Sequence, residues 1–310
     1  MSQPQDDWRA RPGPFAAFAG PSFGWLLAFF LVPLALIFAY SFGRNLSYTE
    51  VSTFETFENY VRIAEPAVLK LLMRSLWLSL LTTLICLAVG LPVAMVIATA
   101  PGRWKPWLLL IVILPFWTNL LIRTYALLNI LGARGRINET FRWFWTQADS
   151  GLTAIGLDGA IGNRYVPIRF LGEESGVVIG LVYVALPFTV LPIYASLERL
   201  DRSLLEASMD LGASQWGTFW RILVPLTMGG IVTAAVITFI PTLGSFVTPD
   251  LLGRGQVDMI SNVISRQFKR ANDWPFGSAL SLVLLYATFI VLALQAWAAA
   301  RSRAGREVRI

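Results

Sequence analysis

The segment EASMDLGASQWGTFWRILVP, residues 206–225, decides how this chain is organised. It mixes Glu206 and other charged residues with bulky apolar residues at nearly helical spacing, and hydrophobic stretches lie on both sides of it. Gly212 permits a bend or a close backbone approach at its centre, and Pro225 indicates where a helix ends and a membrane span begins. The pattern predicts two short helices around a glycine, held against a membrane face. An ordinary surface loop between two spans would explain the same pattern.

The composition is that of an integral membrane protein. The 310 residues are 55% hydrophobic and only 14% charged, with a mean hydropathy of +0.60. Several apolar runs reach the ~20 residues that a helix needs to cross the hydrocarbon layer. The sequence predicts an all-α membrane protein with six transmembrane helices, at about residues 22–42, 70–99, 107–131, 175–197, 226–247 and 276–299.

Polar segments frame the spanning domain, which is predicted over residues 22–299. Residues 1–21 form a polar lead rich in Pro and Gly, and residues 300–310 form a basic tail. The loop 198–225 contains the segment quoted above, and a long outer loop of open role is expected over residues 132–174.

Six spans place both termini on one side of the membrane, and the charge distribution favours the cytoplasm. With that orientation Lys and Arg are denser in the inner segments, including the short turn around Arg103 and the tail. Most acidic residues then fall in the outer loops. We therefore expect a multi-pass membrane protein with cytoplasmic termini.

Several kinds of chemistry are excluded or disfavoured by the residues present. Histidine is absent, which removes His-dependent base, metal and relay chemistry, and the single cysteine, Cys86, lies in an apolar run. A Walker A loop requires a glycine before its lysine, and none of the three lysines follows one. We expect no catalytic residue, metal site or cofactor site on this chain.

Residues 206–225 resemble the EAA signature of ATP-binding-cassette (ABC) importer permeases, in which Glu-Ala-Ala precedes a Gly and an Ile-x-Leu-Pro ending. The residues in that register are Glu206, Ala207, Gly212, Ile222 and Pro225. Ser208 and Val224 depart from it by small, like-for-like changes. Further stretches, PFWTNLLIRTYALL at 115–128, GLVYVALPFTVLPIYASLERLDRSLLEAS at 180–208 and RANDWPFGSA at 270–279, resemble permeases of spermidine/putrescine importers.

This resemblance implies a type I ABC importer permease fold with a cytoplasmic coupling helix, in a bacterial inner membrane. Such a permease forms half of a translocation pathway and hydrolyses nothing itself. It works in a heterodimer with a second permease, two ATPase subunits that bind ATP and Mg²⁺, and a periplasmic binding protein. The ATPase-coupling residues would be Glu206, Ala207, Ser208, Asp210, Leu211, Gly212 and Trp216.

A polyamine is a methylene chain with ammonium groups, so its site should offer carboxylates and aromatic faces. Candidates near the outer half of the spans are Trp117, Tyr125, Tyr183, Phe246 and Asp250. Helix packing or a place in the interfacial belt is the simpler explanation for each aromatic residue. Asp250 is explained as well by a solvated loop acid, and Asp273 is expected to cap or solvate the loop before WPFG.

Two arginines lie within hydrophobic stretches, where a charge is costly unless it pairs or reaches the interface. Arg74 and Arg123 both fall near predicted outer ends, so snorkelling is the simpler expectation. Asn119 lies four residues before Arg123, which would let the two side chains bond to each other or to a neighbouring helix. Pro187 and Pro192 are expected to kink the fourth span.

Other functions remain open at this point. The same permease class could carry ferric iron, a phosphonate or an opine, because the coupling signature does not separate these solutes. An ion-coupled secondary carrier would need ionisable groups near mid-membrane and usually an inverted repeat, and neither is evident. The stretches 115–128 and 270–279 favour spermidine or putrescine without deciding between them.

Overall fold

The computed structural model describes residues 12–47, 50–154, 165–201 and 203–307. Apart from one isolated bridge between Asn45 and Val51, every regular element in these residues is a helix. The chain divides into two compact units. One comprises Met1–Glu65 with Ile264–Leu285, and the other comprises Pro66–Val263 with Tyr286–Ile310.

Five of the described helices are long and apolar enough to cross a membrane. They are Ala19–Ser41, Pro66–Thr99, Glu174–Glu198, Gln215–Leu243 and Trp274–Ala296. A sixth crossing is present if the bent pair Lys105–Trp117 and Leu120–Gly151 counts as one span. The predicted class, an all-α protein with membrane-spanning helices, is confirmed.

The first unit contains the N-terminal helices and the beginning of the last one. Its elements are α1 (Pro12–Leu26), the π-helical η2 (Leu27–Leu31), α2 (Val32–Ser41), α3 (Glu58–Ile63), the π-helical η5 (Gln267–Ala271) and the start of α14 (Trp274–Glu307). Asp273 Oδ1 accepts the Phe276 N–H at 3.2 Å, which caps α14, and Asp273 Oδ2 pairs with Arg62 Nη1 at 3.0 Å. The capping role expected of Asp273 is confirmed.

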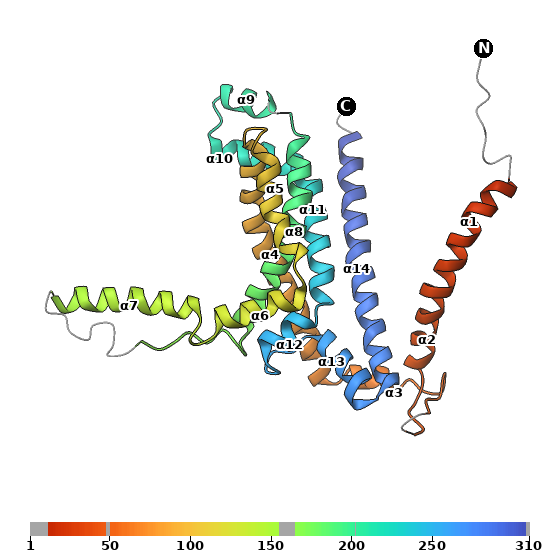
Figure 1. Cartoon of the computed structure of the whole chain (residues 1–310). Coiled ribbons are helices and arrows are strands. Elements are labelled where there is room, and N and C mark those ends of the chain that lie inside the picture. Colours follow the sequence, from red (N-terminus) through yellow and green to blue (C-terminus); the bar gives the residue numbers. More distant parts are fainter. Residues whose placement is uncertain (1–11, 48–49, 155–164, 202, 308–310) are drawn as a thin grey trace, which may run out of the picture. The chain divides into compact units, whose positions relative to one another are not determined.

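The second unit is a helical bundle centred on α8 (Figure 1). Its long helices are α4 (Pro66–Thr99), α5 (Lys105–Ile113), α8 (Glu174–Glu198) and α11 (Val224–Leu243). At one end lie α9 (Ser203–Asp210) and α10 (Gln215–Thr218), and at the other lie α6 (Leu120–Leu131), α7 (Arg136–Ala154), α12 (Val247–Gly253) and the start of α13 (Ile260–Arg266) (Figure 1).

Two clusters of buried apolar side chains fill this bundle. The cluster at the α12 end joins α4, α6, α8 and α12 and contains Leu78, Leu127, Val177, Leu181 and Leu252. The cluster toward α9 joins α4, α8 and α11 and contains Ile97, Val190, Ile193, Leu223 and Ala234. Because α4 and α8 contribute to both clusters, they connect the two ends of the bundle.

Small residues let α8 approach its neighbours closely. A Cβ atom at Gly230 of α11 would collide with Ser196 Cβ and lie 2.9 Å from the Pro192 carbonyl oxygen, both on α8. On the same pair of helices, the hydroxyls of Thr189 and Thr238 lie 2.7 Å apart in a buried hydrogen bond. Such close contacts are how helices associate in lipid, where burial of apolar surface gives little driving force.

The third predicted span, 107–131, is not one straight helix. Helix α5 tightens into the 3₁₀ turn η3 (Leu114–Trp117), the chain becomes extended at Thr118, and α6 begins after a bend of 95°. Asn119 Oδ1 accepts the Leu121 N–H at 2.8 Å and so caps α6. The Asn119 side chain thus caps the helix, and the first of the two alternatives expected from the sequence, a bond to the Arg123 side chain, is not formed through Arg123 Nε or Nη1, which have no partner among the described residues.

Pro225 does not end a helix, contrary to the sequence prediction. The helix runs from Gln215 to Leu243 through the π-helical η4 (Phe219–Leu223). There the Val224 N–H bonds to the Phe219 carbonyl oxygen five residues earlier. This wider turn directly before Pro225 lets the chain admit a residue that lacks an N–H without breaking. Pro187 and Pro192 likewise lie inside the single helix α8, and the kink expected there stays a prediction.

The neighbouring glycines of α11 give a matched test of the close packing. We expect Gly230→Ala to destabilise the bundle by about 1–3 kcal/mol, because the new methyl group meets the α8 backbone. Gly229→Ala should be neutral or slightly stabilising, since nothing lies within 4 Å of a Cβ there. Thermal unfolding of the detergent-solubilised protein measures both, and equal melting temperatures for the two variants would contradict this packing.

Candidate functional site

The segment that organises the sequence forms two short helices joined by a tight turn, as predicted. We call residues 203–218, which include α9 and α10, the elbow. The elbow lies at one end of the bundle (Figure 1) and follows α8 and precedes α11 along the chain. Its second helix continues through η4 into α11 without interruption.

The turn of the elbow depends on Gly212, whose φ is +85°. The Gly212 N–H donates to the Met209 carbonyl oxygen at 2.9 Å, and the Ala213 N–H donates to the Ser208 carbonyl oxygen at 3.1 Å. These two bonds form a Schellman motif, which closes α9 and needs a left-handed residue that glycine adopts without strain. Ser214 then starts α10, since its Oγ accepts the Gly217 N–H at 3.1 Å.

The beginning of α9 is held by Asp201. The backbone N–H of Ser203 donates to Asp201 Oδ1 at 3.0 Å. This bond, with a further one from the Ser203 hydroxyl, keeps the pKa of the Asp201 carboxyl below its ordinary value. The carboxylate is therefore charged at neutral pH, where it favours the helix N-terminus.

A buried hydrogen bond ties the two short helices together. The hydroxyls of Ser208 and Thr218 lie 3.0 Å apart, and both residues are buried. Ser208 is one of the two positions where the sequence departs from the EAA pattern, so the added hydroxyl has a structural use. Leu205 and Phe219 pack against the buried cluster of α4, α8 and α11. The elbow is therefore fixed both internally and to the bundle.

The outer surface of the elbow carries large apolar side chains. Leu211 is 90% exposed and Trp216 is 70% exposed. Trp216 stacks on Phe219 with ring centroids 5.6 Å apart and meets Trp220 edge-on at 5.7 Å. The exposed coupling candidates Glu206, Ala207 and Asp210 share the elbow with this apolar surface. Such a surface, apolar with carboxylates beside it, is suited to binding a partner protein.

The five candidate pathway residues lie toward the other end of the bundle. Tyr125 is on α6, Tyr183 on α8 and Asp250 on α12, and α12 packs against both of the other helices. Phe246 precedes α12, and its carbonyl oxygen accepts the Asp250 N–H at 3.0 Å. Trp117 ends η3, directly before the bend. All five side chains are exposed in the single chain.

Arg123 is buried, so the expectation that it snorkels to the interface is wrong. Its side chain is 7% exposed, and the guanidinium carbon lies 5.9 Å from the centre of the Tyr183 ring. Its Nε and Nη1 atoms have no hydrogen-bond partner among the described residues. A fixed cation at the face of Tyr183 disfavours a second cation there, which argues against Tyr183 as a contact for an ammonium group.

Arg74 is paired rather than free to reach the interface. Its Nε donates to Glu174 Oε1 at 2.8 Å, which joins α4 to the first turn of α8. Both side chains are partly exposed, so the pair contributes about 0–1 kcal/mol to stability.

Across the described part of the chain, no group of three Cys, Asp or Glu side chains could hold a metal ion.

Comparison with known proteins identifies relatives over nearly the whole chain. The family described as "Binding-protein-dependent transport system inner membrane component" matches residues 14–304. The chain is 40% identical over 278 residues to the spermidine/putrescine transport system permease protein PotB of Escherichia coli strain K12, a match that covers 90% of this chain and 94% of that protein. It is 39% identical over 266 residues to the protein of the same name from Haemophilus influenzae, covering 84% and 86%.

A solved structure shows the same fold. The crystal structure of a bacterial ABC transporter involved in the import of the acidic polysaccharide alginate contains a chain that matches with a TM-score of 0.69. The match covers 96% of this chain and 98% of that chain at 19% sequence identity. The permease fold expected from the sequence is therefore confirmed.

The left-handed turn of the elbow can be tested with two glycines of the same segment. We expect Gly212→Ala to destabilise the elbow by about 1–2 kcal/mol, because L-residues with a Cβ are strained at φ +85°. Amide hydrogen exchange within residues 203–218 should then rise by about 5- to 30-fold. Gly217→Ala, inside α10, has a negative φ and places its Cβ 3.3 Å from the Ser214 hydroxyl, which can shift slightly, so amide exchange should rise much less in this variant. Equal exchange in the two variants would mean that the turn does not depend on Gly212.

Proposed function

The chain belongs to the family of binding-protein-dependent transport system inner membrane components, and we propose that it is the permease subunit of an ATP-driven polyamine importer. The observation that carries this proposal is the 40% identity, over 90% of the chain, to a spermidine/putrescine permease. That match includes both spans and loops, so it extends beyond the coupling signature shared by importers of other solutes. Family membership also sets aside an independent ion-coupled carrier.

The protein is a non-catalytic, multi-pass subunit of the inner membrane. It works with a second permease, with cytoplasmic ATPase subunits and with a periplasmic binding protein. ATP and Mg²⁺ bind to the ATPase, which supplies the chemical step. The permease contributes half of the pathway and changes shape when the ATPase does.

We place both termini and the elbow in the cytoplasm. Six crossings bring the termini to one side, and the elbow falls between the fourth and fifth crossings, on that same side. The arginines of residues 300–310 directly follow the last span, which favours the cytoplasm by the positive-inside rule. The elbow is then on the side where the ATPase resides.

The elbow is the site of coupling to the ATPase. Leu211 and Trp216 offer apolar surface for a pocket on the ATPase, and Glu206 offers a carboxylate for a basic residue beside that pocket. Gly212 and the bond between Ser208 and Thr218 keep these side chains in place. Because α10 continues into α11, movement of the pocket displaces a membrane helix as a rigid body.

The substrate pathway runs past the end of the bundle that contains α6 and α12. Trp117, Tyr125 and Phe246 supply exposed aromatic faces for ammonium groups, and Asp250 supplies a carboxylate. Asp250 makes no ion pair with any residue that the structure describes, so its charge is available to a substrate.

Uptake in cells tests substrate and coupling together. In cells that lack this chain, the wild-type protein should restore uptake of labelled spermidine or putrescine. Leu211→Asp should reduce that uptake at least about tenfold, because a charge is costly in an apolar pocket, while Leu211→Met should retain it. Failure of the wild-type protein to restore uptake would refute the polyamine assignment. Full uptake with Leu211→Asp, at equal amounts in the membrane, would refute the coupling role alone.

Asp250 gives a separate prediction for the pathway. We expect Asp250→Asn to raise the KM for spermidine uptake by about tenfold, since hydrogen bonds to charged groups contribute roughly 1.5–3 kcal/mol. Glu139→Gln, an exposed acid on α7, is the matched control and should leave KM unchanged. An unchanged KM in both variants would show that Asp250 is a solvated acid outside the pathway.

A further inference from the structure

Helix α7 leaves the bundle sideways at the end opposite the elbow (Figure 1). The axis of Leu120–Gly151, which includes α6 and α7, makes an angle of 95° with that of Lys105–Trp117. Lys105–Trp117 runs along the bundle, and so along the membrane normal, and takes the chain toward the end opposite the elbow (Figure 1). Helix α7 must then run along the plane of the membrane, with 19 residues that extend about 28 Å.

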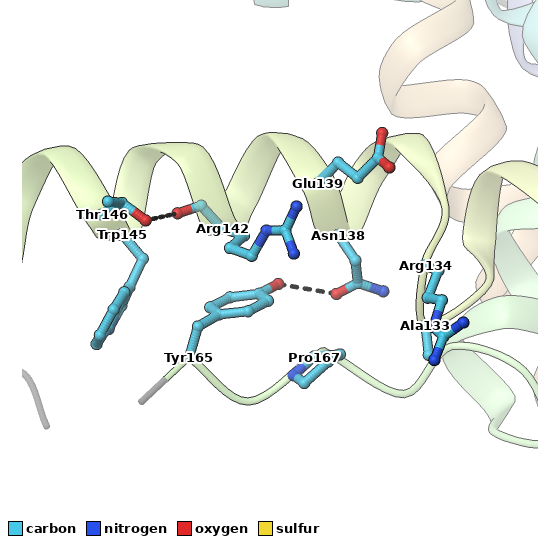
Figure 2. Close-up of a pocket in the computed structure, with 9 residues that line it drawn as sticks. All are labelled: Ala133, Arg134, Asn138, Glu139, Arg142, Trp145, Thr146, Tyr165 and Pro167. Carbon is cyan, nitrogen blue, oxygen red and sulfur yellow. Dashed lines mark hydrogen bonds between the residues drawn. The ribbon is translucent and has the colours of Figure 1, made fainter. Parts of the chain in front are cut away.

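The rotation of α7 about its own axis is fixed by Asn138. The Asn138 side chain is 1% exposed, and its Nδ2 donates to the carbonyl oxygens of Gly132 and Ile168 at 3.0 and 3.1 Å. Its Oδ1 accepts the Ile168 N–H and the Tyr165 hydroxyl, both at 2.8 Å (Figure 2). Residues 165–168 therefore cover this side of α7 and determine which side of the helix is left open.

One exposed face of α7, beside the side that residues 165–168 cover, is apolar and aromatic. Ile137, Phe141 and Phe144 follow at spacings of four and three residues, which places them on one face of the helix. Ile137 packs against the buried cluster of α4, α6, α8 and α12, whereas Phe141 and Phe144 are 46% and 58% exposed. The stripe therefore begins in the core of the membrane bundle and continues outward along α7, where no residue that the structure describes buries Phe141 or Phe144.

Two basic side chains lie beside residues 165–167, namely Arg142 on α7 and Arg134 in the turn directly before α7. An open cavity of about 600 Å³ lies beside these contacts, between α7 and residues 165–167, and Arg134, Glu139 and Arg142 are among the residues that line it (Figure 2). Neither guanidinium forms an ion pair within the described ranges. Arginine above an apolar stripe is the arrangement that suits lipid phosphates above acyl chains.

We propose that α7 is an interfacial helix whose occupant is the phospholipid bilayer on the side opposite the elbow. Phe141 and Phe144 lie at the boundary between headgroups and acyl chains, and Arg134 and Arg142 lie at the level of the phosphates. The membrane surface thus holds the α6–α7 arm beside the mouth of the bundle. This assignment holds for any transported solute, because it follows from the angle and the faces of α7.

Nitroxide accessibility measures the depth of each face directly. Spin labels are attached one at a time at Phe141→Cys, Phe144→Cys and Ser150→Cys, in a Cys86→Ala background. Ser150 is the matched control, because it is exposed on the same helix and lies on the face opposite Phe141. Each labelled protein is assembled with its partner subunits in phospholipid nanodiscs, and relaxation by oxygen is compared with relaxation by a water-soluble nickel chelate.

We expect the ratio of oxygen to nickel accessibility to be several-fold higher at positions 141 and 144 than at position 150. Equal ratios at all three positions would place α7 in water and overturn the proposal. Low accessibility to both reagents at positions 141 and 144 would mean that a protein partner covers the stripe, which would overturn it as well. The coupling role of the elbow would be unaffected by either result.

Discussion

Close packing of α8 against α4 and α11 is the constraint on which the rest of the second unit depends. Within hydrocarbon each helix satisfies its own backbone, and burial of apolar surface gives little drive for association, so the fit between helix surfaces decides which contacts form. That fit is supplied at two places along α8. Ser196 lies against Gly230 of α11, and Thr189 lies against Gly90 of α4 and Thr238 of α11. Because α8 contributes to both buried clusters, its packing unites the elbow end and the α12 end in one body.

Because the bundle packs as one body, a displacement of the elbow can be transmitted to the membrane helices. Leu205 and Phe219 anchor it in the bundle, and the continuous helix from Gln215 to Leu243 carries any displacement into the membrane. Near the same end, Lys105 Nζ donates to Glu198 Oε1 at 2.7 Å and ties α5 to the last residue of α8. A push received at the surface of the elbow is therefore shared by several helices, as a gate driven from a separate ATPase requires.

Local patterns in the sequence were sufficient for the membrane class, for most span positions and for the two short helices around Gly212. Features that depend on tertiary contacts or on competing local signals were missed. An apolar run hides the break at Thr118, although Asn119 before a helical stretch is a recognisable cap. The helix α7 lies within the expected loop 132–174, and its amphipathic spacing could have revealed it. Burial of Arg123 depends on neighbours that no local pattern specifies.

The most direct test of the account is whether the tip of the elbow faces the cytoplasm and touches the ATPase. A Leu211→Cys protein, with Cys86→Ala, can be treated in intact cells with a membrane-impermeant thiol reagent. The account predicts no labelling in intact cells, strong labelling in inside-out vesicles stripped of ATPase, and protection when the ATPase is restored. Labelling from outside the cell, or equal labelling with and without bound ATPase, would contradict it.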